Sequence, residues 1–146
     1  VEKLTSNNNT IYKEETKFFD IYTRTLEIMM INSENIVTKI NDFRFEVDKS
    51  MFSIALKNLI DNAIKFSPNK QAILNARKES ITISSLGEPL KNELSYYTEA
   101  FCQEEKRSEG FGLGLYIVKT ICNLHGYELN YFYKENKNYF EIKLIF

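Results

Sequence analysis

The fold is decided by one stretch of sequence, SMFSIALKNLIDNAIKF at residues 50–66. Its apolar residues recur at steps of three and four, which is the spacing of a helix with one buried face. Asp48 is suited to cap the start of this helix, and Pro68 ends it because proline donates no backbone hydrogen bond. We therefore predict one long amphipathic helix, whose buried stripe consists of Phe52, Ala55, Leu56, Leu59, Ala63 and Phe66.

The same helix carries a second, polar set of residues. Asn58, Asn62 and Lys65 stand at i, i+4 and i+7, so they share one face. Asparagine is a mediocre helix residue because its amide competes for backbone hydrogen bonds. One interpretation is a solvated face. The other is a site in which the two amide oxygens hold Mg²⁺ that carries a polyphosphate, while Lys65 adds positive charge. The residues alone leave both interpretations open.

Helical and strand patterns alternate on either side of this helix. Residues 37–40 and 43–47 resemble a hairpin around Asn41-Asp42, and Gly126 is placed to close a helix. Helices are predicted over 16–31, 90–101 and 115–124, and strands over 37–40, 43–47, 72–76, 81–84, 127–133 and 139–146. This order predicts an α/β two-layer sandwich, in which three main helices pack on a mixed, mostly antiparallel sheet.

A run of glycines, GFGLG at residues 110–114, directly precedes the helix predicted at 115–124. Glycines expose backbone N–H groups without a Cβ atom, and a helix start is the positive end of the helix dipole. The run is neither the dinucleotide fingerprint nor a P-loop. Lys65, Lys106 and Arg107 are candidate counter-charges for phosphate. A flexible hinge is the alternative interpretation.

Composition excludes several classes of protein. The 146 residues carry a formal net charge of -1 and are 43% hydrophobic, which is typical of one soluble domain and unfavourable for binding nucleic acid. No apolar stretch approaches the roughly 20 residues that span a bilayer, and no membrane contact is expected. Cys102 and Cys122 show no metal-ligand spacing.

The chain is expected to consist of a linker and one domain. We expect the linker over 1–15, continuing from a missing upstream segment, and the domain over 16–146.

Together these motifs resemble a known family. Residues 58–66, NLIDNAIKF, closely resemble the N box of bacterial sensor histidine kinases, and residues 110–118 resemble the second glycine box. Residues 81–90 stand in the place of the first glycine box, and residues 97–101 look like the phenylalanine box. The order of the boxes also matches. The resemblance implies the Bergerat ATP-binding fold, which is shared with gyrase, Hsp90-type chaperones and mismatch-repair ATPases.

The resemblance also implies roles for individual residues. Asn62, together with Asn58, would meet Mg²⁺ and the phosphates of ATP, and these two with Lys65 would be the catalytic residues. Residues 102–109 would form a lid that supplies Lys106 or Arg107. The nucleotide-binding residues that the resemblance implies are Asn58, Asn62, Lys65, Phe66, Ser85, Gly87, Lys106, Arg107, Gly110, Gly112, Leu113, Gly114 and Leu115.

Two positions depart from the family pattern. Ser85 stands where the family has an Asp that hydrogen-bonds the amino group of adenine, so a hydroxyl replaces a negative charge. Pro89 stands where the family has a second glycine, and its fixed φ excludes the positive values that glycine permits. We therefore expect a different local turn and altered adenine affinity. A degenerate nucleotide-binding or interaction domain is one alternative function.

The resemblance favours phosphoryl transfer over hydrolysis. Hydrolytic relatives place a Glu at the position of Asn58, whose amide cannot accept a proton at neutral pH. This argues against the other alternative, an ATP-driven conformational switch of the gyrase or chaperone kind. His125, the one histidine, stands at a helix end and is expected to be structural. The acceptor histidine is therefore expected on another segment.

The resemblance finally implies a setting in a two-component signal transduction system. The domain would be the ATP-binding catalytic part of a sensor kinase, with little turnover on its own. Its partners would be an upstream dimerisation domain that carries the histidine, and a cognate response regulator. The whole protein is expected to be a homodimer and this fragment a monomer. It would be the cytoplasmic domain of an inner-membrane receptor kinase.

Overall fold

The central element is helix α3, Lys49–Phe66. The computed structural model describes residues 10–99 and 113–146. Asp48 caps α3, because its Oδ1 atom accepts a hydrogen bond of 3.1 Å from the backbone N of Met51. Ser67 ends the helix with an extended backbone before Pro68. The predicted helix is thus confirmed, except that Phe66 is 39% exposed and is not part of the buried stripe.

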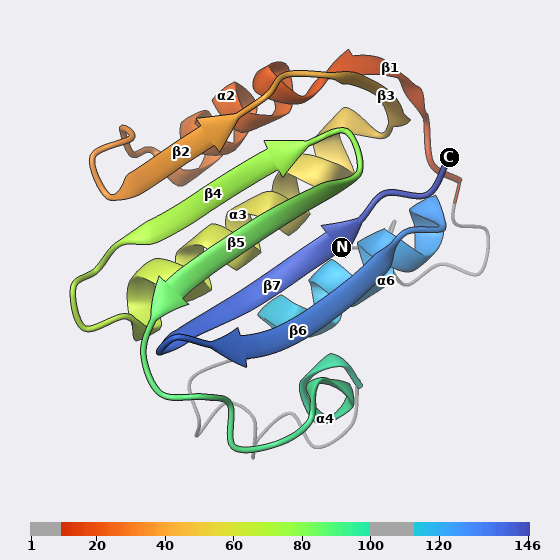
Figure 1. Ribbon diagram of the computed structural model, residues 1–146. Helices are drawn as coiled ribbons and strands as arrows, with labels where there is room; N and C mark the ends of the chain where they lie inside the picture. Colours follow the sequence, from red (N-terminus) through yellow and green to blue (C-terminus); the bar gives the residue numbers. More distant parts are fainter. Residues whose placement is uncertain (1–9, 100–112) are drawn as a thin grey trace.

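A five-stranded sheet packs beside α3, in the order β2-β4-β5-β7-β6 (Figure 1). Strands β4 and β5, β5 and β7, and β6 and β7 pair antiparallel, whereas β2 and β4 pair parallel. The bounds of the strands are Ile36–Ile40 for β2, Ala72–Arg77 for β4, Ser80–Leu86 for β5, Glu128–Lys134 for β6 and Lys137–Lys143 for β7. The predicted mixed, mostly antiparallel sheet is confirmed.

The predicted hairpin around Asn41-Asp42 is wrong. Strand β3, Arg44–Val47, instead pairs antiparallel with β1, Glu14–Lys17, in a separate two-stranded sheet. The backbone N of Asn41 continues the β2 ladder by donating to the carbonyl of Ala76, at 2.9 Å. The Oδ1 atom of Asp42 accepts from the backbone N of Phe19, at 2.9 Å. A half-buried strand can bury its apolar face beside any neighbouring strand. The closeness of 37–40 and 43–47 in the sequence therefore did not show that they pair.

The other helices in the described part of the chain are α2 (Phe18–Met29), α4 (Leu94–Thr98) and α6 (Gly114–His125). Helix α6 ends at Gly126, whose φ of 74° is the left-handed cap that glycine favours. Helix α4 is much shorter than the predicted helix over 90–101. Its N-cap Glu93 is extended, and residues 100 and 101 lie outside the described part of the chain.

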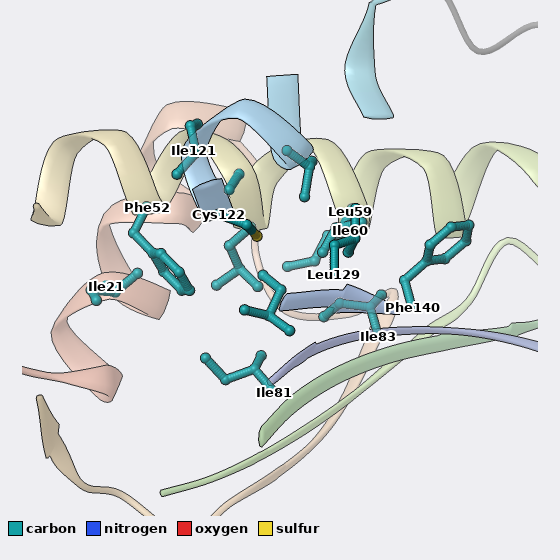
Figure 2. Close-up of a cluster of buried hydrophobic side chains, with 14 of the residues drawn as sticks. Ile21, Phe52, Leu59, Ile60, Ile81, Ile83, Ile121, Cys122, Leu129 and Phe140 are labelled. Carbon is teal, nitrogen blue, oxygen red and sulfur yellow. The ribbon is translucent and has the colours of Figure 1, made fainter. Parts of the chain in front are cut away.

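The core lies between the sheet and the three longer helices, which cover one face of the sheet in Figure 1. Side chains from α2, α3 and α6 meet those of β5, β6 and β7 there (Figure 2). No helix within residues 10–99 and 113–146 has the length and apolar character of a membrane span. The core members labelled in Figure 2 are Ile21, Phe52, Leu59, Ile60, Ile81, Ile83, Ile121, Cys122, Leu129 and Phe140.

Candidate functional site

A cavity of about 630 Å³ lies where the C-terminal end of α3 meets β5, β7 and the segment 87–91. Asn62, Lys65 and Phe66 contribute to its wall from α3, and Ser85 contributes from β5. Tyr97 of α4 also lines it. This volume is in the range of sites for small molecules and cofactors. The cavity therefore gathers five of the predicted nucleotide-binding residues around a space that can hold a nucleotide: Asn62, Lys65, Phe66, Ser85 and Gly87.

The two asparagines of α3 differ in their surroundings. The Nδ2 atom of Asn58 donates to the backbone oxygen of Ile54, at 2.9 Å. The Nδ2 atom of Asn62 is buried and has no hydrogen-bond partner among the described residues. A buried polar atom without a partner is unfavourable in a folded protein. Asn62, which also lines the cavity, is therefore a candidate to bind a ligand.

The first turn of α6 lies directly against these two amides. A Cβ atom added to Gly114 would lie 3.4 Å from Oδ1 of Asn58 and 3.5 Å from Nδ2 of Asn62. The side chain of Leu113 is 50% exposed, whereas that of Leu115 is 1% exposed and belongs to the core. Two motifs more than forty residues apart, which the sequence linked only by resemblance, are thus brought together at Gly114.

On the opposite wall, the alternation of β5 sets the direction of Ser85. This residue is on the same face as Ile81 and Ile83, which are buried in the core, so its side chain faces the helices and the cavity. Gly87 follows with a φ of 152°, which favours glycine. A buried hydroxyl and a glycine turn therefore form the sheet side of the cavity.

Positive charge predominates around the cavity. Among the described residues, its lining includes Lys65, Lys70 and Lys91, against one acidic residue, Glu88. The Nζ atom of Lys70 donates to the backbone oxygen of Lys65, at 3.1 Å, and the Nζ atom of Lys65 lies 5.3 Å from the ring centroid of Phe66. This imbalance attracts an anionic ligand.

Several site residues were not predicted from the sequence. Lys70, Lys91, Asn138 and Phe140 line the cavity, and each comes from a segment that carried no motif. Tyr97 was part of the phenylalanine-box resemblance but was not assigned a role. Conversely, some predicted site residues lie outside the described residues: Lys106, Arg107, Gly110 and Gly112.

His125 lies at the other end of α3. Its Nε2 atom accepts from the backbone N of Asp48 at 3.0 Å, so the ring hydrogen is on Nδ1, which donates to the backbone oxygen of Ile121 at 2.8 Å. Burial lowers the pKa of His125. The neutral ring therefore joins the end of α6 to the start of α3, and its place in the fold is structural.

The sandwich of sheet and helices, with a lysine-lined cavity beside paired amides, defines a nucleotide-binding α/β domain. The chain belongs to the histidine kinase-, DNA gyrase B- and HSP90-like ATPase family, whose profile matches residues 47–144. Membership confirms the family resemblance read from the sequence, and it makes ATP the nucleotide of this class of domain. The roles of individual site residues remain predictions.

The relatives within this family are sensor kinases. Sensor histidine kinase ArsS of Helicobacter pylori is 32% identical over 147 aligned positions, which cover 97% of this chain and 34% of that protein. The chain thus spans about a third of its relative. The fold matches that of the Acinetobacter baumannii histidine kinase AdeS, with a TM-score of 0.71, 18% identity, and coverage of 98% of this chain and 73% of that one. The mycobacterial sensor histidine kinase MprB matches with a TM-score of 0.68 and 22% identity, over 91% and 97% of the two chains.

Proposed function

We propose that this domain binds Mg²⁺-ATP in the cavity and transfers the γ-phosphoryl group to a histidine on a separate dimerisation domain. The observation that carries the proposal is the convergence of three groups. The Oδ1 atom of Asn58 and the buried Nδ2 atom of Asn62 both face Gly114, at the start of α6. A helix start beside a buried donor suits a phosphate.

The cavity suggests one orientation for ATP. The phosphates lie toward Asn62, Lys65 and Gly114, where positive charge and the start of α6 coincide. The purine lies toward Ser85 and Gly87 on the sheet side. Phe66 lines the cavity next to Lys65. We further propose that Leu113, Lys106, Arg107, Gly110 and Gly112 contribute to nucleotide binding, as the family resemblance implies.

The residues present fit Mg²⁺ that arrives with the nucleotide. Within residues 10–99 and 113–146 no cluster of three His, Cys, Asp or Glu side chains could hold a metal by itself. The amide oxygens of Asn58 and Asn62 are neutral ligands, and half a turn of the Asn62 amide would present its oxygen instead of Nδ2. Mg²⁺ favours few protein ligands together with water and phosphate oxygens. When bound, it neutralises charge on the phosphates.

The proposed reaction needs no general base in this domain. The amide of Asn58 cannot accept a proton at neutral pH, so this side chain cannot activate water. The acceptor imidazole nitrogen forms a bond to the γ-phosphorus, the bond to the β,γ-bridging oxygen breaks, and ADP leaves with the electron pair. The residues of the cavity contribute by positioning the triphosphate and stabilising its charge.

The proposed partners are those that the family resemblance implies. The whole protein is a homodimer that carries the acceptor histidine upstream of this domain, and a response regulator receives the phosphoryl group. The domain itself faces the cytoplasm, where ATP is available.

One observation favours a second candidate function, a degenerate nucleotide-binding domain. Ser85 presents a hydroxyl in place of the family's carboxylate at the purine end.

Calorimetric titration with a non-hydrolysable ATP analogue, with and without Mg²⁺, tests the proposal. Asn62→Ala should abolish binding, because it removes the buried amide that faces Gly114. Asn123→Ala is the matched control, since Asn123 is an exposed asparagine of another helix, α6. Binding by the unaltered chain and the control, lost in Asn62→Ala, supports the proposal. Absence of binding by the unaltered chain contradicts it and favours the degenerate domain.

A further inference from the structure

The segment 87–90 follows β5 and forms part of the cavity wall. It depends on hydrogen bonds from other parts of the protein. Pro89 has no backbone N–H, and the positive φ of Gly87 takes the chain out of the β5 ladder. Backbone groups at such a site need partners from elsewhere in the protein or from water. The partners of this segment therefore determine the shape of the wall.

Those partners come from the β6–β7 hairpin. The backbone N of Gly87 donates to the backbone oxygen of Asn136 at 3.1 Å, and the hydroxyl of Tyr133 donates to the backbone oxygen of Gly87 at 2.9 Å. The Nδ2 atom of Asn138 donates to the backbone oxygen of Glu88 at 2.9 Å. Two of these three hydrogen bonds use side chains, so the identity of the hairpin residues matters.

Tyr131 and Asn138 form the central link. The hydroxyl of Tyr131 accepts from the backbone N of Leu90 at 3.0 Å and donates to Oδ1 of Asn138 at 2.5 Å. The Tyr131 ring packs against Phe140, with ring centroids 5.1 Å apart. Asn138 also pairs with Ser85 in the register of β5 and β7. One tyrosine hydroxyl and one amide thus connect Glu88 and Leu90 of the segment to the strand beside Ser85.

We propose that Tyr131 and Asn138 are positioning residues, which hold the segment 87–90 in place and thereby set the affinity of the cavity for the nucleoside part of its ligand. This role rests on the proposed ATP site. The proposed phosphate end lies at Asn62 of α3 and Gly114 of α6, whereas the hydrogen bonds of Tyr131 and Asn138 reach the segment 87–90. Loss of the link should therefore weaken binding of the nucleoside and leave binding of the phosphates unchanged.

The test compares two ligands, a non-hydrolysable ATP analogue and inorganic tripolyphosphate, each with Mg²⁺, on the full chain. Tyr131→Phe removes the hydroxyl and keeps the ring. We expect the dissociation constant of the ATP analogue to rise on the order of fivefold, which is the effect of one lost hydrogen bond, with tripolyphosphate unaffected. Hydrogen exchange of the Leu90 amide should become faster in the same variant.

The matched control is Tyr127→Phe. Tyr127 is also largely buried, and its hydroxyl donates to the backbone oxygen of Glu46 at 3.0 Å, but it does not line this cavity. An equal loss in Tyr131→Phe and Tyr127→Phe, equal losses for both ligands, or unchanged binding in Tyr131→Phe would each overturn the role. If the unaltered chain binds neither ligand, the proposed function fails, and this role fails with it.

A second variant covers the case in which Tyr131→Phe does not fold. Asn138→Ala removes the bond to Glu88 and the acceptor for Tyr131, and it should show the same difference between the two ligands. In the double variant the two effects should not add, because both act through one link. If both single variants unfold, the pair serves the fold alone and the role is overturned.

Discussion

The Nε2 atom of His125 accepts a hydrogen bond of 3.0 Å from the backbone N of Asp48, which joins the last residue of α6 to the N-cap of α3. This bond requires an unprotonated Nε2. Protonation would turn the acceptor into a donor that faces another donor. Burial lowers the pKa of His125 accordingly.

Stability should therefore fall in mild acid. A folded-state pKa below the unfolded value of about 6.5 means that the contribution of His125 is complete above that pH. The contribution is lost as the pH falls toward the folded pKa. Urea unfolding between pH 7.5 and pH 5 measures the effect. The sequence has one histidine, so His125→Gln should flatten this part of the profile, and an unchanged slope would contradict the assignment.

Replacing Asp48 should destabilise the fold. Its carboxylate accepts from the backbone N of Met51 at 3.1 Å and from that of Tyr12 at 3.0 Å, and the side chain is buried. Asp48→Ala should lower the free energy of unfolding by about 1–2 kcal/mol, the usual effect of a lost N-cap. Chemical denaturation measures the change. Asp48→Asn keeps an acceptor and should lose less; equal losses would show that capping is not the cause.

Gly114→Ala should separate stability from binding. The added Cβ would make contacts of 3.4 and 3.5 Å with the two asparagine amides, which are ordinary van der Waals distances, so the fold should tolerate it. Alanine also favours a helix by up to about 1 kcal/mol over glycine. However, the methyl group would occupy the space between the amides and the phosphates. We expect unchanged or higher thermal stability, with ATP-analogue affinity reduced about tenfold.

Gly126→Ala provides the contrasting control. Gly126 has a φ of 74°, and no atom of the described residues lies within 4 Å of an added Cβ, so the expected effect of the substitution is backbone strain. It should destabilise the protein by about 1 kcal/mol and leave nucleotide affinity unchanged. If Gly114→Ala bound ATP as tightly as Gly126→Ala, phosphates would not lie beside α6.

Ser85→Asp tests the proposed orientation of the purine. A carboxylate at this position would accept a hydrogen bond from the amino group of adenine and would repel the 6-oxo group of guanine. Hydrogen bonds to charged groups are about 1 kcal/mol stronger than neutral ones, so affinity for the ATP analogue should rise roughly fivefold over the unaltered chain. Titration with ATP and GTP analogues measures the preference. No change in that preference would place the purine away from Ser85.

Much of the fold was predictable because its signals are local. The apolar spacing of α3, the cap at Asp48 and the left-handed turn at Gly126 each depend on a few neighbouring residues. The family resemblance, which the profile match over residues 47–144 confirms, likewise follows from short motifs in a fixed order. The sequence by itself therefore determined the class of domain and the two motifs from which its site is built.

The tertiary structure decided which strands pair and which distant side chains come into contact. The partner of β3 is β1, rather than its neighbour β2, because strand alternation specifies a buried face without specifying the strand beside it. The closeness of Asn58 to Gly114 and the link from Tyr131 through Asn138 to Glu88 are also long-range contacts. A hydroxyl or an amide forms such a hydrogen bond only when packing of the core brings a distant group within hydrogen-bond distance. Local sequence patterns do not predict which groups packing brings together.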